Sequence, residues 1–409
     1  TAEAVSPSME HIGETSEIAI IGGGICGLTT AIALERRGAS PTVYEAASEY
    51  RPVGAGILLQ TNALLALDRL GIADRVRSAG MALDDARILS PSGRVLQRFD
   101  LEGVERTRYD YGYVAIQRGD LQQVLLDELG GAVRTGKACA AVEDPESPTV
   151  RFEDGMRISP DIVIGADGID SNVRGAIAPE AETRSFDAAV HRSVVPCELP
   201  ERCRSTGVEV WGHGTYTGGA PVGSDRFYWF ATVPNRLESA TTYHRPRAEW
   251  VREHYRGFPE PIPTVIESLD SDDIITTGLA DVPPLDRWSR GSVALAGDAA
   301  HGMLPFAGQG AAQAIEDAVA LAAALTTSED PPTAFDAYER ERKRRADQIR
   351  TESRWLGALG TAQSSLACRA RNAGATLLPG GVVRRFRQRR ILGASLAEEI
   401  TADPEKRPG

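Results

Sequence analysis

Three glycines near the start of the chain have the spacing that dinucleotide binding requires. Gly22, Gly24 and Gly27 fit the pattern G-x-G-x-x-G, which joins a strand to a helix. The first glycine allows a tight turn, the second lets the backbone approach a pyrophosphate, and the third lets helix and strand pack closely. The N-terminus of the helix then presents unpaired N–H groups to the phosphates. The stretch therefore predicts a dinucleotide site in preference to a purely structural turn.

The segments around these glycines have the patterns that such a site needs. The apolar run 18–21 predicts a buried strand, and residues 28–34 predict the helix after the turn. A second strand is predicted over residues 41–44, and Glu45 stands directly after it. An acid at this distance from the glycines can accept hydrogen bonds from ribose hydroxyl groups.

Two later segments place an acid after a fully apolar strand. Asp167 follows the run 162–164 in GADGIDSNVR, and Asp298 follows the run 292–296 in AGDAAHGMLPFAGQGAAQAIEDA. Doubly wound sheets bind ligands at the carboxyl ends of their strands, so both carboxylates are candidate cofactor contacts. After Asp298 come a proline turn and a long alanine-rich helix, whose positive end faces the same crevice. The candidate contacts in this part are Pro305, Gly308, Gly310 and Ala311.

A basic residue and a glycine between these motifs are further candidates for cofactor binding. Arg118 stands just before a helix predicted over residues 121–129, with Gly119 or Asp120 as its N-cap. A guanidinium there can bind a phosphate through two hydrogen bonds; the alternative is a solvated charge that flanks the helix. Gly56 closes a loop rich in glycine.

Length, charge and cysteine content exclude several classes of protein. The 409 residues favour one large domain or two interleaved domains. The formal net charge of −12 argues against nucleic acid as a partner, and no apolar run approaches the length of a membrane span. The five cysteines show no metal-binding spacing, and an odd count without a secretory signal favours reduced thiols. We therefore expect a cytoplasmic protein without a metal site.

The texture of the sequence changes along the chain. Residues 186–280 alternate in Val, Thr, Tyr, Phe and Trp, which predicts a mostly antiparallel sheet in a second domain. Residues 333–373 read as helices, and the charge run 339–345 predicts a solvated helix face. The expected parts are a disordered tail (1–16), the first part of a nucleotide-binding domain (17–185, with 81–108 contributing to the second domain), the β-rich domain (186–280), the last part of the first domain (281–350) and a C-terminal helical segment (351–409).

The three motifs occur in an order that resembles a known enzyme family. GGGICG with Glu45, then GADGIDSNVR, then AGDAAHGMLPFAGQGAAQAIEDA look like the motifs of single-component FAD-dependent monooxygenases, the p-hydroxybenzoate hydroxylase-like and salicylate hydroxylase-like aromatic hydroxylases. The resemblance covers residues 17 to about 350. It implies an α/β fold with a Rossmann-like FAD-binding domain, an interleaved, mostly antiparallel β-sheet substrate domain and C-terminal helices. It also implies that Arg118 lies beside FAD.

The resemblance further implies a reaction. FAD is the cofactor, NADH or NADPH is the reductant, and O2 supplies the oxygen that a flavin C4a-hydroperoxide transfers to a small aromatic, phenolic substrate. The helix start at residues 308–311 would stabilise anionic reduced flavin. Pro305 would stiffen the turn under the ring, and Phe306 would face the substrate.

Activation of a phenol requires a base or a charge-stabilising group in the second domain. The candidates are Arg192, His213 and Tyr216, although each has the alternative of a polar side chain satisfied on a sheet face. Some family members carry a functional arginine near position 192. His301 is expected to pack near the flavin edge without acting as a base, and His191 has no assigned role.

Other reactions stay open on the same flavin site. One alternative is hydroxylation or epoxidation of a larger lipophilic substrate, such as a polyketide or terpenoid; another is a flavin-dependent lipid reductase of the same superfamily. A halogenase would carry a W-x-W-x-I-P segment and a lysine near the ring, but the sequence has no such segment and only three lysines. A non-catalytic flavin-binding module would show decayed motifs, and these are intact. No motif encodes the substrate, the choice between NADH and NADPH, or the oligomeric state.

Overall fold

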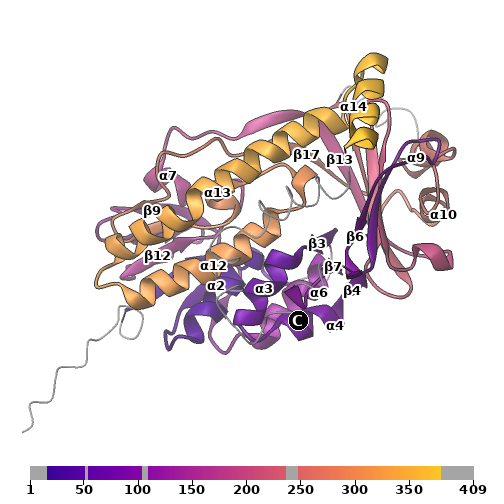
Figure 1. Cartoon of the computed structure of the whole chain (residues 1–409). Helices are drawn as coiled ribbons and strands as arrows, with labels where there is room; N and C mark the ends of the chain where they lie inside the picture. Colours follow the sequence, from indigo (N-terminus) through magenta and orange to yellow (C-terminus); the bar gives the residue numbers. More distant parts are fainter. Residues whose placement is uncertain (1–15, 51–53, 104–108, 236–246, 379–409) are drawn as a thin grey trace, which may run out of the picture.

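The computed structural model describes residues 16–50, 54–103, 109–235 and 247–378 (Figure 1). The tail predicted over residues 1–16 lies outside the described residues except for Ser16, and the predicted C-terminal segment lies outside them from residue 379 onward. No described helix is long and apolar enough to cross a bilayer. Among the described residues, no group of His, Cys, Asp or Glu side chains has metal-binding geometry. All five cysteines are free thiols.

Six short strands form the first large sheet. They are β1 (Ile18–Ile21), β2 (Thr42–Tyr44), β8 (Val133–Arg134), β12 (Ile162–Gly165), β18 (Ser289–Arg290) and β19 (Val293–Leu295). Their order is β18-β19-β12-β1-β2-β8, and the central pairs are parallel. Every residue of β1 and of β12 is buried, which is why both segments are continuous apolar runs.

Helices cover this sheet and one another. The relevant ones are α2 (Ile25–Glu35), α3 (Thr61–Arg69), α4 (Ala73–Ala79), α6 (Arg118–Glu128), α12 (Gly310–Thr327) and α13 (Pro331–Gly360). Helix α12 packs against α2, α3 and α13, and Figure 1 shows it between α13 and the indigo helices of the N-terminal part. Most of its side chains are buried, which explains its alanine-rich composition.

The turn between β1 and α2 is packed so closely that only glycine fits. Gly22 has φ +104°, and a Cβ atom there would lie 2.3 Å from the carbonyl oxygen of Ala166 after β12. A Cβ atom on Gly27 would lie 1.8 Å from the carbonyl oxygen of Gly22. The helix after the turn starts at Ile25, three residues earlier than the predicted start at residue 28.

Seven strands form the second large sheet. They are β5 (Asp85–Leu89), β6 (Val95–Asp100), β13 (Arg184–Pro196), β14 (Thr206–Trp211), β15 (Tyr216–Pro221), β16 (Arg226–Val233) and β17 (Ile275–Asp281). The order is β17-β13-β16-β15-β14-β5-β6, and only β14 and β5 are parallel. The prediction of a mostly antiparallel sheet is confirmed.

The two faces of this sheet have different neighbours. Helices α9 (Arg247–Tyr255) and α10 (Ile262–Glu267) form a core with one face, in which Trp229 and Tyr255 are fully buried. The opposite face carries Phe230 and contacts Leu304 and Phe306, which belong to the segment before α12. Residues on alternate positions of each strand therefore belong to the helical core or to the side that faces the first part of the chain.

Two small sheets complete the fold, and one of them lies against the second large sheet. Strands β3 (Gly56–Leu59), β4 (Met81–Leu83) and β7 (Tyr113–Gln117) form one small antiparallel sheet, and β9 (Cys139–Glu143), β10 (Thr149–Phe152) and β11 (Arg157–Ile158) form another. A Cβ atom on Gly56 would lie 2.3 Å from the ring of Tyr228, so β3 approaches β16 closely. Arg226 of β16 donates to Asp120 at 3.0 Å and to Gln117 at 2.5 Å.

The start of α6 corrects one prediction. The helix begins at Arg118, and Gln117 is its N-cap, so Gly119 and Asp120 already lie inside the first turn. No described side chain caps this end. The carboxylate of Asp120 pairs instead with Arg226 of the second sheet. A tertiary ion pair, which local sequence does not reveal, thus takes the group that was expected to cap the helix.

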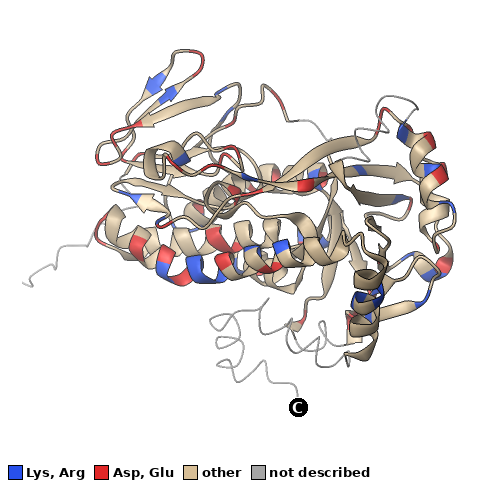
Figure 2. Ribbon diagram, turned by 90° about the horizontal axis from the view of Figure 1, so that it is seen from above, with Lys and Arg blue, Asp and Glu red and all other residues tan. Residues whose placement is uncertain are grey.

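The C-terminal helices connect both large sheets. Helix α13 begins after Asp330, whose carboxylate accepts a hydrogen bond from the N–H of Thr333, and it is followed by α14 (Ser365–Leu377). Figure 2 shows acidic and basic residues alternating along the outer side of α13. The prediction that the run 339–345 is a solvated face holds only in part, because Arg342 is 4% exposed and points into the protein.

A pair of helical glycines tests the close packing at the first turn. Gly27→Ala should lower the free energy of unfolding by about 1–3 kcal/mol, because the added methyl group overlaps the backbone of Gly22. The matched control is Gly374→Ala in α14, where a Cβ atom meets nothing within 4 Å. Because alanine favours helix over glycine, this control should stabilise by up to about 1 kcal/mol. Chemical denaturation of both variants measures the difference, and equal effects would contradict the packing argument.

Candidate active site

Gly24, the second glycine of the G-x-G-x-x-G pattern, borders open space. Gly24 is the N-cap of α2 in an extended conformation, and no side chain of the described residues caps that helix end. A Cβ atom on Gly24 would meet nothing within 4 Å, in contrast to those on Gly22 and Gly27. The helix N-terminus therefore borders free space, where its N–H groups can reach a phosphate.

Glu45 is tied to the same turn. Its carboxylate accepts hydrogen bonds from the N–H of Gly23 at 2.7 Å and from the N–H of Ala47 at 2.8 Å. The hydroxyl of Tyr50 is buried beside Gly23 and has no hydrogen-bond partner among the described residues. Burial, and secondarily the charge of Glu45, raises the pKa of Tyr50 to about 12, so this hydroxyl stays protonated and can donate.

Asp298 and Arg118 come together from distant parts of the chain. Asp298 opens the short helix α11 (Asp298–His301), after Gly297 with φ +60°. Its side chain is solvent-accessible, although protein atoms enclose it on several sides; that enclosure raises its pKa, while the charges of His301 and Arg118 oppose the rise. Neither the Asp298 carboxylate nor the Arg118 guanidinium hydrogen-bonds to any described residue, so both are available to a ligand.

The start of α12 faces the same carboxylate. A Cβ atom on Gly310 would lie 4.0 Å from Oδ1 of Asp298. Before it, Pro305 opens the one-turn helix η3 (Pro305–Ala307), and Gly308 has φ +62°. The side-chain amide of Gln60 donates to the carbonyl groups of Ala307 and Gly308, both at 3.1 Å. Ala311 then follows in the first turn of α12, so all four predicted residues of this segment lie around one helix start.

Asp167 is placed differently from Asp298. Its Oδ1 accepts from the Ser171 hydroxyl at 2.6 Å, and its Oδ2 accepts from the N–H groups of Asn172 and Val173 at 2.8 and 3.1 Å. These bonds shape the turn before α7 (Arg174–Ile177). The guanidinium of Arg174 donates to the Ala299 carbonyl at 3.1 Å, which joins this turn to α11. The carboxylate thus organises its own loop, and a direct cofactor contact stays a prediction.

One face of the second sheet, together with Phe306 of η3, forms an aromatic wall that includes Arg192. Phe306 lies 5.6 Å from Phe186 and 5.7 Å from Tyr216, measured between ring centroids, and Phe230 lies 5.2 Å from Tyr216. Arg192 of β13 pairs with Phe230 of β16, so their side chains share this face. We call Phe186, Arg192, Tyr216, Tyr228, Phe230 and Phe306 the aromatic wall.

The three substrate-side candidates are therefore separated. Arg192 donates through Nη2 to the Thr277 hydroxyl at 2.6 Å, and its Nε is buried without a hydrogen-bond partner among the described residues. Tyr216 is buried in the wall. His213 lies in the loop between β14 and β15; it is exposed, and its Nε2 is 3.0 Å from the Ser365 hydroxyl of α14. His191 faces the opposite side of the sheet, near Trp250.

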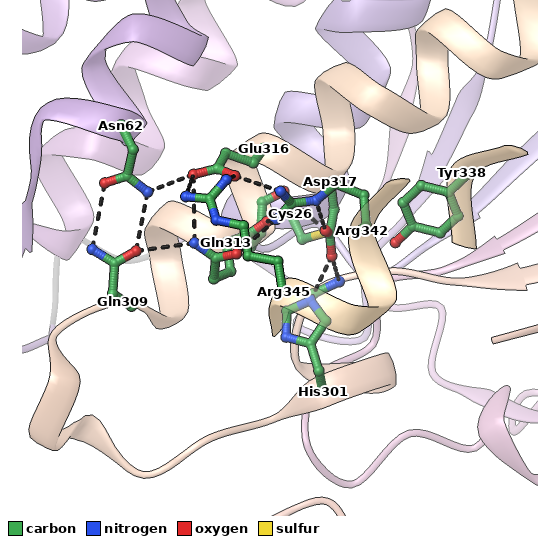
Figure 3. Close-up of polar contacts among 12 residues, drawn as sticks. Cys26, Asn62, His301, Gln309, Gln313, Glu316, Asp317, Tyr338, Arg342 and Arg345 are labelled. Atoms are coloured by element: carbon green, nitrogen blue, oxygen red, sulfur yellow. Dashed lines mark hydrogen bonds and ion pairs between the residues drawn. The ribbon is translucent and has the colours of Figure 1, made fainter. Parts of the chain in front are cut away.

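Sequence reasoning missed a buried charge cluster beneath α11 (Figure 3). His301 is 1% exposed and lies 2.6 Å from Oδ2 of Asp317, so it supports the turn from inside the protein. Arg342 pairs with both Glu316 and Asp317. Two adjacent acids within an alanine-rich, mostly apolar helix were the signal in the sequence. Tyr50, Tyr228 and Phe230 were also missed as site residues.

The residues around the glycine turn fit FAD. Open space above Gly24 and a free helix N-terminus suit the pyrophosphate, and Glu45 suits ribose hydroxyls. The buried, unpartnered hydroxyl of Tyr50 and the uncommitted side chains of Arg118 and Asp298 add a donor, a cation and an acceptor. These groups are the ones that a dinucleotide with phosphates and polyol hydroxyls requires.

Comparisons with known proteins agree with this site. The family described as "FAD binding domain" matches residues 15–353. The chain is 35% identical over 356 residues to an aurachin C monooxygenase/isomerase of Stigmatella aurantiaca, covering 86% of this chain and 91% of the relative. It is 35% identical over 360 residues to the 3-amino-4-hydroxybenzoate 2-monooxygenase PtnB3 of Streptomyces platensis, covering 85% of this chain and 90% of the relative.

A solved structure has the same architecture. The crystal structure of Klebsiella pneumoniae HpxO complexed with FAD and uric acid superposes with a TM-score of 0.83 and 28% identity, covering 93% of this chain and 97% of that one. The predicted fold class and the predicted FAD cofactor are both confirmed. The chain belongs to the FAD-binding-domain family, and within it to the FAD-dependent monooxygenases.

Proposed function

We propose that the protein uses NADH or NADPH and O2 to hydroxylate a small aromatic, phenolic substrate that binds against the aromatic wall. The observation that carries this proposal is Arg192: a guanidinium with a buried, unpartnered Nε among aromatic rings. Flat rings favour a flat aromatic substrate, and the guanidinium favours one with an anionic oxygen. Bound FAD, once reduced, supplies the oxygen-activating chemistry.

The aromatic residues of the wall would stack on the substrate, and Arg192 would bind its charged oxygen. Tyr216, Phe230 and Phe306 offer ring faces and edges to a substrate ring. Arg192 stabilises the phenolate form by binding its oxygen, which makes the substrate ring electron-rich. Arg192 itself does not accept the proton, because a guanidinium stays charged in proteins. Burial raises the pKa of Tyr228 to about 12, against the opposing charge of Arg192, so its hydroxyl is a hydrogen-bond donor and not a base.

Cofactor binding rests on the residues around the glycine turn. Gly22, Gly24 and Gly27 would bring the backbone to the pyrophosphate, Glu45 would bind ribose, and Arg118 would bind phosphate. Asp298 would accept hydrogen bonds from hydroxyl groups of the flavin side chain. The loop residues Gly56, Asp167, Pro305, Gly308, Gly310 and Ala311 would line the space that FAD fills.

A larger lipophilic substrate is the second candidate. The wall holds one charged residue among five aromatic ones, and the similar aurachin C monooxygenase/isomerase is not named for a simple phenolic acid. Such a substrate, of polyketide or terpenoid type, would be hydroxylated or epoxidised by the same flavin chemistry. A panel that contains phenolic acids and alkylated bicyclic compounds separates the two candidates through substrate-stimulated NAD(P)H oxidation.

Asp298→Ala should weaken FAD binding while leaving the fold intact. A charge-assisted hydrogen bond contributes about 1.5–3 kcal/mol, so the dissociation constant of FAD should rise about tenfold or more. Recovery of flavin fluorescence on dilution of the yellow holoenzyme measures this constant, and circular dichroism checks the fold. An unchanged dissociation constant would assign Asp298 a structural role only.

Arg192→Met should uncouple the reaction. NAD(P)H oxidation should continue with formation of hydrogen peroxide, while hydroxylated product falls about ten- to hundredfold, because the anionic substrate oxygen loses a charged partner. The ratio of product to NAD(P)H consumed, with peroxide measured in parallel, gives the coupling. Tyr216→Phe tests the other wall candidate, and the exposed His213→Ala is the control that should keep wild-type coupling. Wild-type coupling in both Arg192→Met and Tyr216→Phe would contradict the roles of these two residues and redirect the search to Phe306.

A further inference from the structure

We propose that Asp317 is a positioning residue for cofactor affinity: clamped by Arg342 and His301, it holds the turn that carries Asp298. The proposal rests on the proposed contact between Asp298 and FAD. Asp317 lies within α12 and is fully buried, and its carboxylate bonds Gly297, His301 and Arg342 and no described residue of the aromatic wall or the glycine turn. Its effect on FAD would therefore pass through Asp298.

Asp317 contacts both ends of the turn from Gly297 to His301. Its Oδ2 accepts from the N–H of Gly297 at 3.0 Å, directly before Asp298, and lies 2.6 Å from Nε2 of His301, the last residue of α11. Figure 3 shows the contact between His301 and this carboxylate. Because Gly297 and His301 bracket Asp298, fixing them leaves the Asp298 backbone little freedom to rotate.

Helix geometry gives the same carboxylate a second link to Asp298. Gly310 and Asp317 are separated by seven residues in α12, close to two full turns, so they lie on one face of the helix. Gly310 approaches Oδ1 of Asp298, while Asp317 holds the backbone before Asp298. One helix face therefore sets both the position of Asp298 and its distance from the helix N-terminus.

Arg342 keeps this buried carboxylate charged. Burial alone would favour the neutral acid, but the charges of His301 and Arg342 and their hydrogen bonds lower the pKa of Asp317 well below its ordinary value. Arg342 donates through Nε to Oδ1 at 2.8 Å, which leaves Oδ2 for the turn. An ionised carboxylate is a stronger acceptor for the Gly297 N–H than a neutral acid.

Among the described residues, the side chain that accepts a hydrogen bond from the N–H of Gly297 is that of Asp317. Gly297 has φ +60°, and a Cβ atom there would lie 2.9 Å from Sγ of Cys26, so the backbone follows a path that only glycine adopts. Among the described residues no side chain caps α11. The N–H groups of Ala300 and His301 close the turn internally by donating to the Gly297 carbonyl at 3.0 and 2.9 Å, and Asp317 anchors the closed turn to another helix.

The neighbouring acid provides a matched control. Glu316 shares Arg342 with Asp317 but bonds Asn62, Gln313 and Arg345 and no residue of the turn. Glu316→Gln thus disturbs the same buried ion pairs without releasing Gly297 or His301. It should lower thermal stability and leave FAD affinity within about twofold of wild type, since its loss acts on stability and not on the turn.

The test is a double-mutant cycle on the FAD-loaded protein, with flavin fluorescence on dilution as the readout. Asp317→Asn should raise the dissociation constant of FAD about tenfold in the wild-type background and less than twofold in the Asp298→Ala background. His301→Gln is the milder variant, which keeps the Arg342 pair, and it should follow the same pattern with a smaller rise. A purely structural role would give equal factors in both backgrounds and would overturn the proposal.

The remaining outcomes are also decisive. An unchanged affinity in Asp317→Asn and His301→Gln overturns the positioning role, and so does an equal loss of affinity in Glu316→Gln. If Asp298→Ala itself leaves FAD affinity unchanged, the proposed contact of Asp298 fails, and the positioning role fails with it. The two failures are distinguishable. Failure of the Asp298 contact appears in the Asp298→Ala single variant, whereas failure of the positioning role alone leaves the effect of Asp298→Ala intact.

Discussion

The pairing of Arg342 with Glu316 and Asp317 is the interaction on which the rest of the molecule depends. Helix α12 is enclosed by α2, α3 and α13, so two acids within it would be buried charges without a partner. An unpaired buried carboxylate is costly, and cations from α13 therefore have to reach it. This requirement fixes α13 against α12, and it orders the turn that leads into α12 from β19.

Once α12 and α13 are fixed, the second sheet has a defined place. The C-terminal part of α13 touches the aromatic wall, because a Cβ atom on Gly357 would lie 2.5 Å from the Phe306 ring. On the other side, Tyr228 packs on Gly56 and Arg226 pairs with Asp120. The wall is thus held from both ends by elements of the FAD-binding part, which keeps its aromatic rings near the start of α12.

The two halves of the site differ in how their polar groups are satisfied. Around the glycine turn, the carboxylates of Glu45 and Asp167 have hydrogen-bond partners within the protein, whereas the Asp298 carboxylate and the Arg118 guanidinium have none among the described residues. In the wall, one arginine stands among rings. Groups already bonded in the protein preorganise a site, and uncommitted groups supply the binding energy for a ligand. This division suits a resident cofactor beside an exchanging substrate.

Local patterns in the sequence determined the parallel strands, the glycine turn with its dinucleotide site and the alternating strands of the second sheet, because each of these depends on periodicity or on residues close in the chain. The resemblance of the three motifs to a known family implied that the dinucleotide is FAD. The tertiary structure decided which side chains from distant parts of the chain contact one another. Gly119 or Asp120 was predicted to cap α6, but the helix begins before both residues, and Asp120 forms an ion pair with the distant Arg226. The run 339–345 looked solvated throughout, yet Arg342 turns inward to two acids far away in sequence. His213 and Tyr216 are three residues apart, but only Tyr216 joins the wall, since strand β15 begins at that residue. Side-chain partners across the core follow from packing, and no local period encodes them.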